Sequence, residues 1–513
     1  MKKVAQERAR AAKRKKRIII ISVVSVLAVL LITAGVLFYV KVSGHKGTVG
    51  SCSWTLSNDG VMTVSGTGST KGKVFVTFGL GKCSLDDVKE VVIEEGVTDV
   101  YAPFIKAMTN LTKVTVPSSV NDIEDGTFTS NKLLSSIVVA EGNTNFSSLD
   151  GSLYDKSQTK LICYPSAISN ADFVVPGSVE EIATYAFKDV SSLVTVRLNS
   201  GLIVIDDLAF VGVPNLKSID IDDSNESYIS DGKVLYDQGQ TTVIRVAPSS
   251  DLTSVELPDT VTQIGDAAFE GCSSITSVVL NDRITRIGVG AFNGCSGLTE
   301  ITIPEGCRRI CDGVFAKCTS LKSVTLPSEY TSIPSNLFWG CTSLTSVTIP
   351  ETVTSIGDGA FCNCTSLTQI DIPVTVTAIG SNAFGGCIGL ASIELPEGLA
   401  AISDYAFNKC TALKEITIPE SVSSVGYAAF ADCKSLTAVT VPDGVTSIGD
   451  FAFFNCSGLS TVNLGRGIKT IGEAAFKNCT ALGSIFYAGS QADWAGVSVG
   501  SDNDKVKSSL QFK

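Results

Sequence analysis

The pattern of apolar positions repeats every 23 residues over the C-terminal half of the chain. A Phe marks each repeat, and ten of these Phe follow one another at this interval without a slip, from Phe269 to Phe476. Counting from each Phe, a Cys follows at +3, a Leu or Ile at +6, a β-branched residue at +9 and, in most repeats, an aliphatic residue at +11. A fixed period of this length predicts a solenoid, because one short unit cannot bury its own apolar face and has to stack on its neighbours.

Each part of the repeat predicts one structural element. The segment L-x-x-[VI]-x-[IL] alternates with a period of two and predicts a short strand, and like strands would stack into a parallel sheet. Pro ends this strand in most repeats, and V-T-x-I-G predicts a second extended pass with Gly at a turn. The A-F-x-x-C segment predicts a short helical turn, with Ala, Phe and Cys on one face. We expect the apolar columns to form one continuous core.

The same pattern recurs upstream with wider spacing. The marker Phe stands at positions 128, 187 and 210 before Phe269, so the intervals are 59, 23 and 59 residues, and a degenerate first unit ends near Phe104. Each long interval contains an insert, at about 140–175 and about 221–257, in which apolar runs flank a polar turn and predict a β-hairpin. About fourteen units are expected, stacked into a rod.

The N-terminal segment predicts a membrane anchor. Residues 18–40 are 23 residues without a charge, enough as a helix to cross a hydrocarbon layer of about 30 Å. Residues 1–17 carry nine Lys or Arg against one Glu, which predicts a cytoplasmic tail and extracellular repeats in a single-pass protein of the cell membrane. A cleaved signal peptide is the alternative, disfavoured because the apolar run exceeds the usual core of about 7–15 residues and no A-x-A site follows.

The repeat motif AFxxCxxLxxIxIPxxVxxIG resembles the BspA-like class of leucine-rich repeat found in bacterial surface proteins, over residues 89–487. After a linker at 41–50, the stretch SCSWTLSNDGVMTVSGTG in residues 51–88 is similar to the β-rich lead-in of such proteins, and YAGSQADW resembles their terminal unit and opens a C-terminal cap at 488–513. The resemblance implies a leucine-rich repeat solenoid used for attachment or recognition. It implies no catalytic residue and no cofactor.

Composition narrows the chemistry further. His45 is the only His, so one copy of the chain cannot assemble a Ser/His/Asp triad, a Cys/His dyad or a His-based zinc centre. Asp and Glu are scattered rather than paired in a predicted cleft, as a glycosidase would need. We therefore expect no enzyme. The portion after residue 41 has a net charge of −20, which would repel phosphate and excludes nucleic acid as a partner.

The sixteen Cys and the acidic stretches allow two readings each. Disulfides or thiolate metal ligands are possible in an exported chain, but the invariant +3 column favours buried structural thiols. Outside that column, Cys52 and Cys83 are the best candidate disulfide. The acidic stretch from Asp220 departs from a calcium loop at Asn225 and Asp231, so a solvated loop is favoured and no metal site is expected.

The most promising binding surface is the exposed face of the predicted strands. Side chains at +8 and +10 would point away from the core and line up across repeats. Such a Thr-rich column could contact glycan hydroxyls, a protein strand or an ice-like water lattice, although Thr is also simply a good solvent-facing strand residue. Trp339 is the only Trp within the repeats, so aromatic platforms for sugars are sparse. The candidate residues at +10 are Thr302, Thr325, Thr348, Asp371, Glu394, Thr417, Thr440 and Asn463.

Together these features predict a membrane-anchored extracellular protein that mediates adhesion or recognition. Its partner would be a protein or glycan on a host, a neighbouring cell or its own envelope, and it would contact the membrane through residues 18–40. The alternative is a structural envelope spacer or self-associating scaffold without a foreign ligand.

Overall fold

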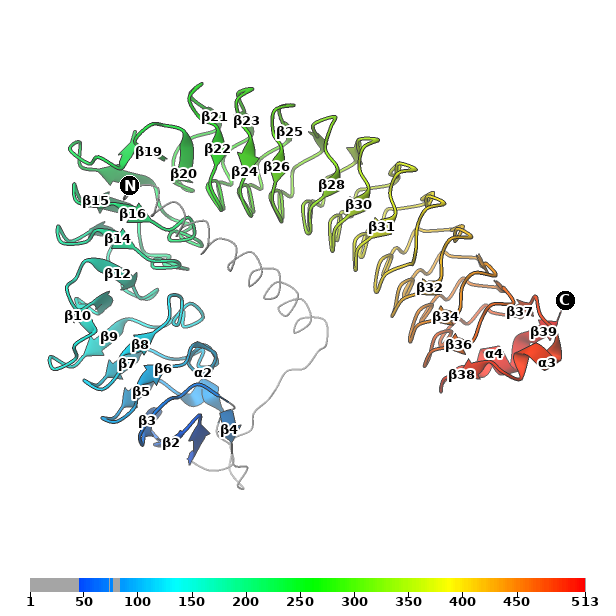
Figure 1. Cartoon of the computed structure of the whole chain (residues 1–513), viewed down its shortest axis with the longest axis horizontal. Helices are drawn as coiled ribbons and strands as arrows, with labels where there is room; N and C mark the ends of the chain where they lie inside the picture. The colour runs from blue at the N-terminus through cyan, green and yellow to red at the C-terminus, as the bar shows by residue number, and fades with distance from the viewer. Residues whose placement is uncertain (1–45, 73, 77–83, 513) are drawn as a thin grey trace, which may run out of the picture.

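The computed structural model of the chain describes residues 46–72, 74–76 and 84–512, and these form a stack of coils that curves into an open arc rather than a straight rod (Figure 1). The predicted tail at 1–17, the predicted span at 18–40 and most of the linker at 41–50 lie outside the described residues. Within the described ranges, no helix is long and apolar enough to cross a membrane.

One column of strands follows the L-x-x-[VI]-x-[IL] segments. Most of these strands pair in parallel with the strand one coil away, and equivalent residues lie opposite one another, such as Val324 opposite Val347. Burial alternates along each strand because successive side chains point to opposite faces: Ser323 and Thr325 are exposed, whereas Val324 is buried. The column consists of β5 (Glu90–Ile93), β7 (Lys113–Val116), β9 (Ser136–Val139), β13 (Asp172–Val174), β15 (Thr195–Leu198), β17 (Ser218–Ile221), β21 (Ser254–Glu256), β23 (Ser277–Val279), β25 (Glu300–Thr302), β27 (Ser323–Thr325), β29 (Ser346–Val347), β33 (Ala438–Val441), β35 (Thr461–Leu464), β37 (Ser484–Tyr487) and β39 (Leu510–Phe512).

A second column of two-residue strands follows, in most coils after the Pro, with Ile333 opposite Ile356 as an example of its register. A Cβ on Gly357, just after one of these strands, would lie 2.6 Å from the Ser335 nitrogen, so Gly is required where the coils approach most closely. The column consists of β6 (Asp99–Val100), β8 (Asp122–Ile123), β14 (Glu181–Ile182), β16 (Val204–Ile205), β22 (Gln263–Ile264), β24 (Arg286–Ile287), β26 (Arg309–Ile310), β28 (Ser332–Ile333), β30 (Ser355–Ile356), β31 (Ala378–Ile379), β32 (Ser424–Val425), β34 (Ser447–Ile448), β36 (Thr470–Ile471) and β38 (Ser498–Val499).

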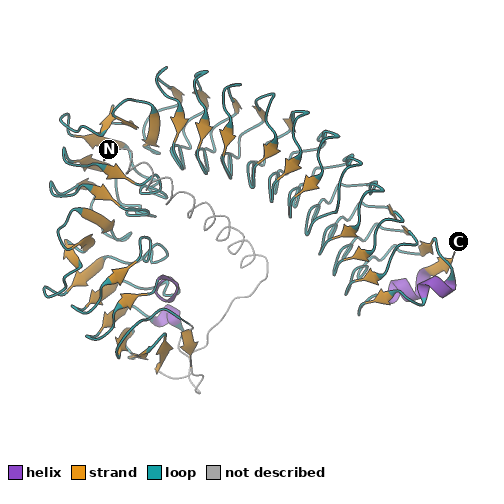
Figure 2. Cartoon of the chain, in the orientation of Figure 1, coloured by secondary structure: helices purple, strands orange, loops and turns teal. Residues whose placement is uncertain are grey.

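The A-F-x-x-C segment does not form the expected helical turn, and Figure 2 shows loop rather than helix along most of the arc. The backbone is left-handed two residues before and two residues after the Phe, with φ of 61° at both Gly359 and Asn363. Left-handed residues interrupt a right-handed helix, so the segment is a run of tight turns instead. It also links the coils, because the Phe361 N–H donates to the Ala383 carbonyl at 2.8 Å.

The two inserts each form three strands rather than a simple hairpin. In each insert the second strand pairs antiparallel with both the first and the third. The third strand then pairs in parallel with the next strand of the second column, as Lys160 with Glu181. The inserts therefore continue the sheet of the solenoid rather than projecting from it. Their strands are β10 (Phe146–Leu149), β11 (Ser152–Asp155) and β12 (Lys160–Cys163) in the first, and β18 (Tyr228–Ser230), β19 (Val234–Asp237) and β20 (Thr242–Val246) in the second.

Both ends of the solenoid are covered. At the N-terminal end an antiparallel sheet places Trp54 over the first coil, where its side chain is fully buried, and its third strand pairs in parallel with β5. At the other end the Trp494 ring packs 5.0 Å from the Tyr487 ring, and Val506 is buried in the same core. The covering elements are β1 (Lys46–Val49), β2 (Cys52–Leu56), β3 (Val61–Ser65), β4 (Val74–Val76), the 3-10 helix η1 (Leu85–Asp87), α3 (Gln491–Trp494) and α4 (Asp504–Ser509), while α2 (Ala102–Lys106) belongs to the first coil.

The core is continuous only within each of three sections, contrary to the single core expected from the sequence. Three clusters of buried apolar side chains span residues 49–162, 154–247 and 234–506, and they meet at the inserts. Leu153 on β11 belongs to the first cluster and its neighbour Tyr154 to the second. Successive side chains of a strand point to opposite faces, so each insert acts as a wall between two cores.

Candidate binding surfaces of the solenoid

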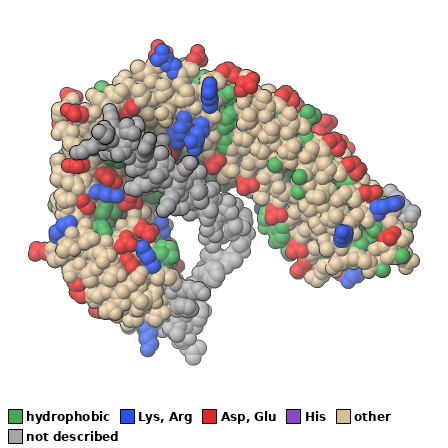
Figure 3. Space-filling model, in the orientation of Figure 1, with side chains coloured by type: hydrophobic (Ala, Val, Ile, Leu, Met, Phe, Trp, Pro, Cys, Tyr) green, Lys and Arg blue, Asp and Glu red, His purple; other side chains and the backbone are tan. Residues whose placement is uncertain are grey.

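The structure places the predicted binding residues on one exposed face, which we call the rung face. Seven of the eight are exposed and Asn463 is half-buried. The neighbouring positions are buried, as at Val324 and Leu326 on either side of Thr325, which are 4% and 5% exposed. Acidic side chains are scattered along the visible side of the arc, consistent with its net negative charge (Figure 3). The rung face is therefore a polar surface on an apolar support.

Backbone pairing brings rung-face residues of neighbouring coils together. Thr302 lies opposite Thr325 in parallel strands, and Thr417 forms a bridge with Thr440. The Asn463 amide nitrogen lies 3.3 Å from the Thr440 hydroxyl and donates to it. Strands in a sheet are about 4.8 Å apart, so the column presents one polar side chain at each such step.

The strand column is interrupted in the middle of the rung face. Residues 369–372 and 392–395 stand at the strand positions of their coils but form no strand. Asp371 and Glu394 stand there on adjacent coils, and like charges on neighbouring strands destabilise their pairing. The rung face thus has a negative centre between two Thr-rich stretches.

A small hollow lies elsewhere, beside the first insert. It is lined by Glu124, Phe128, Cys163, Tyr164 and Lys188 among others. The Tyr164 hydroxyl is buried without a hydrogen-bond partner, and burial raises the pKa of both Tyr164 and Cys163 to about 12. Both groups stay protonated at neutral pH, so neither is an activated nucleophile.

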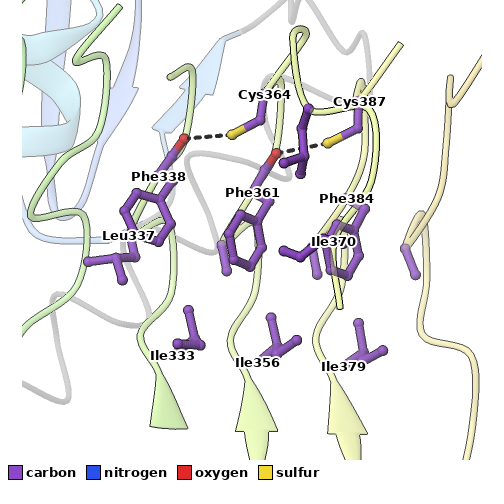
Figure 4. Packing of buried hydrophobic residues seen from close by; sticks show 14 of the residues in the cluster. Ile333, Leu337, Phe338, Ile356, Phe361, Cys364, Ile370, Ile379, Phe384 and Cys387 are labelled. Atoms are coloured by element: carbon purple, nitrogen blue, oxygen red, sulfur yellow. Dashed lines mark hydrogen bonds between the residues drawn. The ribbon is translucent and has the colours of Figure 1, made fainter. Parts of the chain in front are cut away.

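The Cys of the +3 column are structural. The Cys364 thiol is fully buried and donates to the Phe338 carbonyl of the preceding coil at 3.2 Å, and the Cys387 thiol does the same to Phe361 (Figure 4). Burial raises the pKa of the Cys341 thiol to about 12, so this thiol is protonated and unreactive at neutral pH. All fifteen Cys within the described residues are free thiols.

The other candidate metal and disulfide positions have structural explanations. Cys52 is a buried free thiol, and Cys83 lies outside the described residues. Asn225, where a calcium loop needs Gly, is buried; its amide donates to the Leu202 carbonyl at 2.9 Å and its oxygen accepts the Tyr228 N–H at 2.8 Å. In the part of the chain that the structure describes, no group of three or more His, Cys, Asp or Glu could hold a metal ion.

The sequence interpretation missed a group of surface aromatic residues, which we call the aromatic strip: Tyr405, Tyr427, Phe451 and Phe454. Their ring centroids are 5.1, 5.5 and 5.7 Å apart in that order. Tyr427 is 38% exposed and the other three are half-buried. Burial, then the adjacent Tyr427 and Asp404, raise the pKa of Tyr405 to about 12. The strip lies beside the turn segments of three successive coils, away from the rung face.

Two residues of the strip occupy unfavourable backbone positions. Tyr405 and Phe451 are left-handed, with φ of 56° and 58°. A left-handed conformation costs a residue with a side chain about 1–2 kcal/mol. The other coils of the uninterrupted array carry Gly, Ala or Asn at this position, two residues before the marker Phe. Aligning the repeats on that position would have revealed the two aromatic residues.

Parallel coils stacked at a short period, with one strand column and covered ends, define a leucine-rich repeat solenoid. The chain belongs to the family described as the BspA type leucine rich repeat region, whose six-copy profile matches residues 81–171, 161–233, 247–368 and 354–483. These ranges cover well over half of the chain. No curated protein matches it.

Several solved structures are similar to this chain. A leucine-rich repeat protein from Eubacterium ventriosum is 26% identical, with 75% of this chain and 94% of that protein covered and a TM-score of 0.44. One from Bacteroides ovatus is 23% identical, with 72% and 97% covered and a TM-score of 0.38. A leucine rich cell surface protein from Faecalibacterium prausnitzii is also 23% identical, with 88% and 97% covered and a TM-score of 0.31. Leucine-rich repeat solenoids are typically non-enzymatic scaffolds that bind proteins or other ligands.

Proposed function

We propose that this chain is an extracellular recognition protein, held to the cell membrane by residues 18–40, whose solenoid binds a protein or glycan on a host, a neighbouring cell or its own envelope. The observation that supports this most is the rung face, where equivalent polar side chains repeat on coil after coil and no described element covers them. Such a surface suits an extended partner, because many modest contacts add up along it.

Three features of the chain argue against a catalytic role. The hollow beside the first insert contains a protonated thiol and a protonated phenol, and the chain's single His lies outside the described residues. The rung face is exposed, so it holds no substrate away from water. We therefore propose binding without turnover.

Retention of the full chain on surfaces tests this function. The purified protein, kept in mild detergent, is passed over immobilised host matrix proteins, mucin glycans and envelope fragments of the producing cell at physiological salt. We expect saturable retention on a host surface. We expect that retention to disappear when Thr348, Asp371, Glu394 and Thr417 are all replaced by Ala while the circular dichroism spectrum is unchanged.

The outcomes separate the alternatives. Binding to the producing cell's envelope alone would indicate the scaffold role instead of recognition of a foreign ligand. Retention that survives the fourfold substitution would remove the rung face as the binding surface, and no retention on any of the three surfaces would contradict the proposed function.

A further inference from the structure

The aromatic strip differs from the other surface aromatic residues beside the turn segments. The Lys188 ammonium lies over the Tyr185 ring, 5.6 Å from its centre, and the Lys317 ammonium lies 5.4 Å from the centre of the Trp339 ring. Within the described residues, no Lys or Arg covers a ring of the strip. Among the described residues, Lys thus covers two surface rings, and no cation covers the strip.

The strip is not explained by stability alone. Two of its members adopt a backbone conformation that small residues adopt at the same position in the other coils of the uninterrupted array. An aromatic side chain held in an unfavourable conformation and partly exposed points to a function at that place. In Figure 3, hydrophobic side chains gather at the inner edge of the arc over its C-terminal half, the half that contains these coils.

Carboxylates border the strip. Asp404 and Asp450 stand next to Tyr405 and Phe451 in the chain and are exposed. Each is held in place by a backbone contact: Asp404 accepts the Tyr427 N–H at 2.7 Å, and Asp450 accepts the Glu473 N–H at 2.6 Å. The faces of aromatic rings carry partial negative charge, so rings and carboxylates together favour a cation.

We propose that the aromatic strip is a docking site for a Lys- or Arg-bearing segment of a partner protein. The inference rests on the proposed recognition function and assigns it a second contact surface beside the turn segments. A cationic side chain of the partner would lie over a ring of the strip, as Lys188 lies over Tyr185 and Lys317 over Trp339. A flat glycan fits less well, because neighbouring rings of the strip are tilted by 56°, 58° and 73° and offer no common plane for stacking sugars.

Peptide binding to the full chain in detergent tests the inference. One fluorescein-labelled peptide alternates Lys with Gly, and its counterpart carries acetyl-lysine, which has no charge. We expect the Lys peptide to bind saturably by fluorescence anisotropy, and the acetylated peptide to bind about tenfold more weakly. Absence of saturable binding by the Lys peptide, or equal binding by both peptides, would overturn the proposal.

The strip variant combines Tyr405→Asn, Tyr427→Ser, Phe451→Asn and Phe454→Asn. Each new side chain already stands at the same position of another coil, at Asn382, Ser381, Asn336 and Asn293, so the fold should be retained. We expect about a tenfold loss of affinity for the Lys peptide. The matched control combines Ser335→Ala with Asn336→Ala. These residues stand three and two positions before their marker Phe, as Tyr427 and Tyr405 do, but three coils upstream of Tyr405, so the affinity should be unchanged.

The carboxylates are tested by Asp404→Asn with Asp450→Asn, which retains the oxygen that accepts each backbone N–H. We expect several-fold weaker binding and a smaller dependence on salt.

An unchanged affinity in the strip variant would mean that the peptide is attracted by the net charge of the whole ectodomain and would overturn the proposal. Loss of mucin oligosaccharide binding in the strip variant, with the Lys peptide unaffected, would assign the strip to sugars instead.

The fourfold rung-face variant separates this inference from the proposed function. We expect it to lose retention on host surfaces and to bind the Lys peptide normally. Peptide binding that is lost in the rung-face variant and kept in the strip variant would overturn the strip alone. A third outcome is that neither the variants nor the wild type are retained on any surface, while peptide binding still depends on the strip. That outcome would count against the proposed function alone.

Discussion

The uninterrupted array from Phe269 to Tyr487 and the half with two inserts before it use the same repeat differently. In the array every marker Phe stacks on the next, with ring centroids 4.7 to 5.9 Å apart. Before it, only Phe187 and Phe210 stack, at 5.0 Å. An insert separates the other marker Phe of that half from the next coil, so its core is assembled in sections.

The residue at +3 from the marker Phe also differs between the two halves. Every coil of the array has Cys there, whereas the earlier half has Asn131, Val190 and Val213. The Asn131 amide donates to the Ile105 carbonyl at 2.9 Å, the same relation between coils that the Cys thiols make. The position therefore requires a small side chain, which can be either apolar or a hydrogen-bond donor. Cys supplies both properties, which explains its regular use without any redox role.

Alkaline pH should have the largest effect and should act on the array first. Burial raises the pKa of Cys272, Cys341 and Cys433 from 9.0 to about 12. The folded state then keeps a proton that the unfolded chain releases above pH 9, so the free energy of unfolding falls as pH rises from 9 to 12, by up to about 1.4 kcal/mol per thiol for each pH unit.

The earlier half should lose less stability between pH 9 and 10. Burial raises the pKa of one of its thiols, Cys163, from 9.0 to about 12, whereas burial raises the pKa of Tyr154 and Tyr236 from 10.0 to about 12, so most of its loss of stability begins near pH 10. Ultraviolet absorbance of thiolate and of tyrosinate, followed with circular dichroism during a pH titration, distinguishes the two. Tyrosinate that forms before thiolate would contradict this order.

Truncating a marker Phe should cost more in the array than outside it. Phe361 is fully buried between two stacked rings, so Phe361→Ala should lower the free energy of unfolding by about 3–5 kcal/mol. Phe128 is 6% exposed and no ring of the described residues stacks on it, so Phe128→Ala should cost less. Urea unfolding with hydrogen exchange read coil by coil measures both, and equal costs would show that stacking adds nothing.

Exchanging the residues at +3 should have a smaller effect. Cys364→Val removes a thiol that donates to a carbonyl and should cost about 1 kcal/mol, the usual value of one hydrogen bond. Val190→Cys should be close to neutral, because the smaller side chain gains a donor. Urea midpoints of the two variants give the comparison, and a loss above about 3 kcal/mol for Cys364→Val would mean that the position has no room for a second methyl group.

The smallest effect is expected on the rung face. Thr348→Ala in the array and Val138→Ala outside it both alter exposed side chains, so each should change stability by no more than about 0.5 kcal/mol. Thermal unfolding checks this directly. A larger loss at Thr348 would show that the face contributes to the fold, which would complicate its use for binding tests.

Much of the solenoid was predictable because its signals are local or strictly periodic. The 23-residue spacing of Phe, Cys and Leu specified the coils, and the alternation around Val324 specified which side chains of a strand are buried. The rung face followed from the same alternation. The left-handed residues in the A-F-x-x-C segment had only a partial signal. Gly or Asn stands at many of these positions, but Ala, Lys, Tyr or Phe adopts the same conformation in other coils, where backbone hydrogen bonds to the next coil support it.

The aromatic strip shows the limit most clearly. Tyr405 and Tyr427 are 22 residues apart and Tyr427 and Phe451 are 24 apart, so no column with a period of 23 contains all three. They meet because adjoining positions of successive coils come into contact, as the Tyr405 N–H does with the Tyr427 carbonyl at 2.8 Å. Such contacts depend on how the coils stack.

The sequence by itself determined the repeat, the identity of its buried columns and the family of the chain, because each of these is set by spacing along the backbone. Only the tertiary structure decided the curvature of the stack, the division of the core by the inserts and the meeting of the four aromatic rings. These depend on contacts between coils, where small differences in side-chain volume and backbone hydrogen bonding add up from one coil to the next.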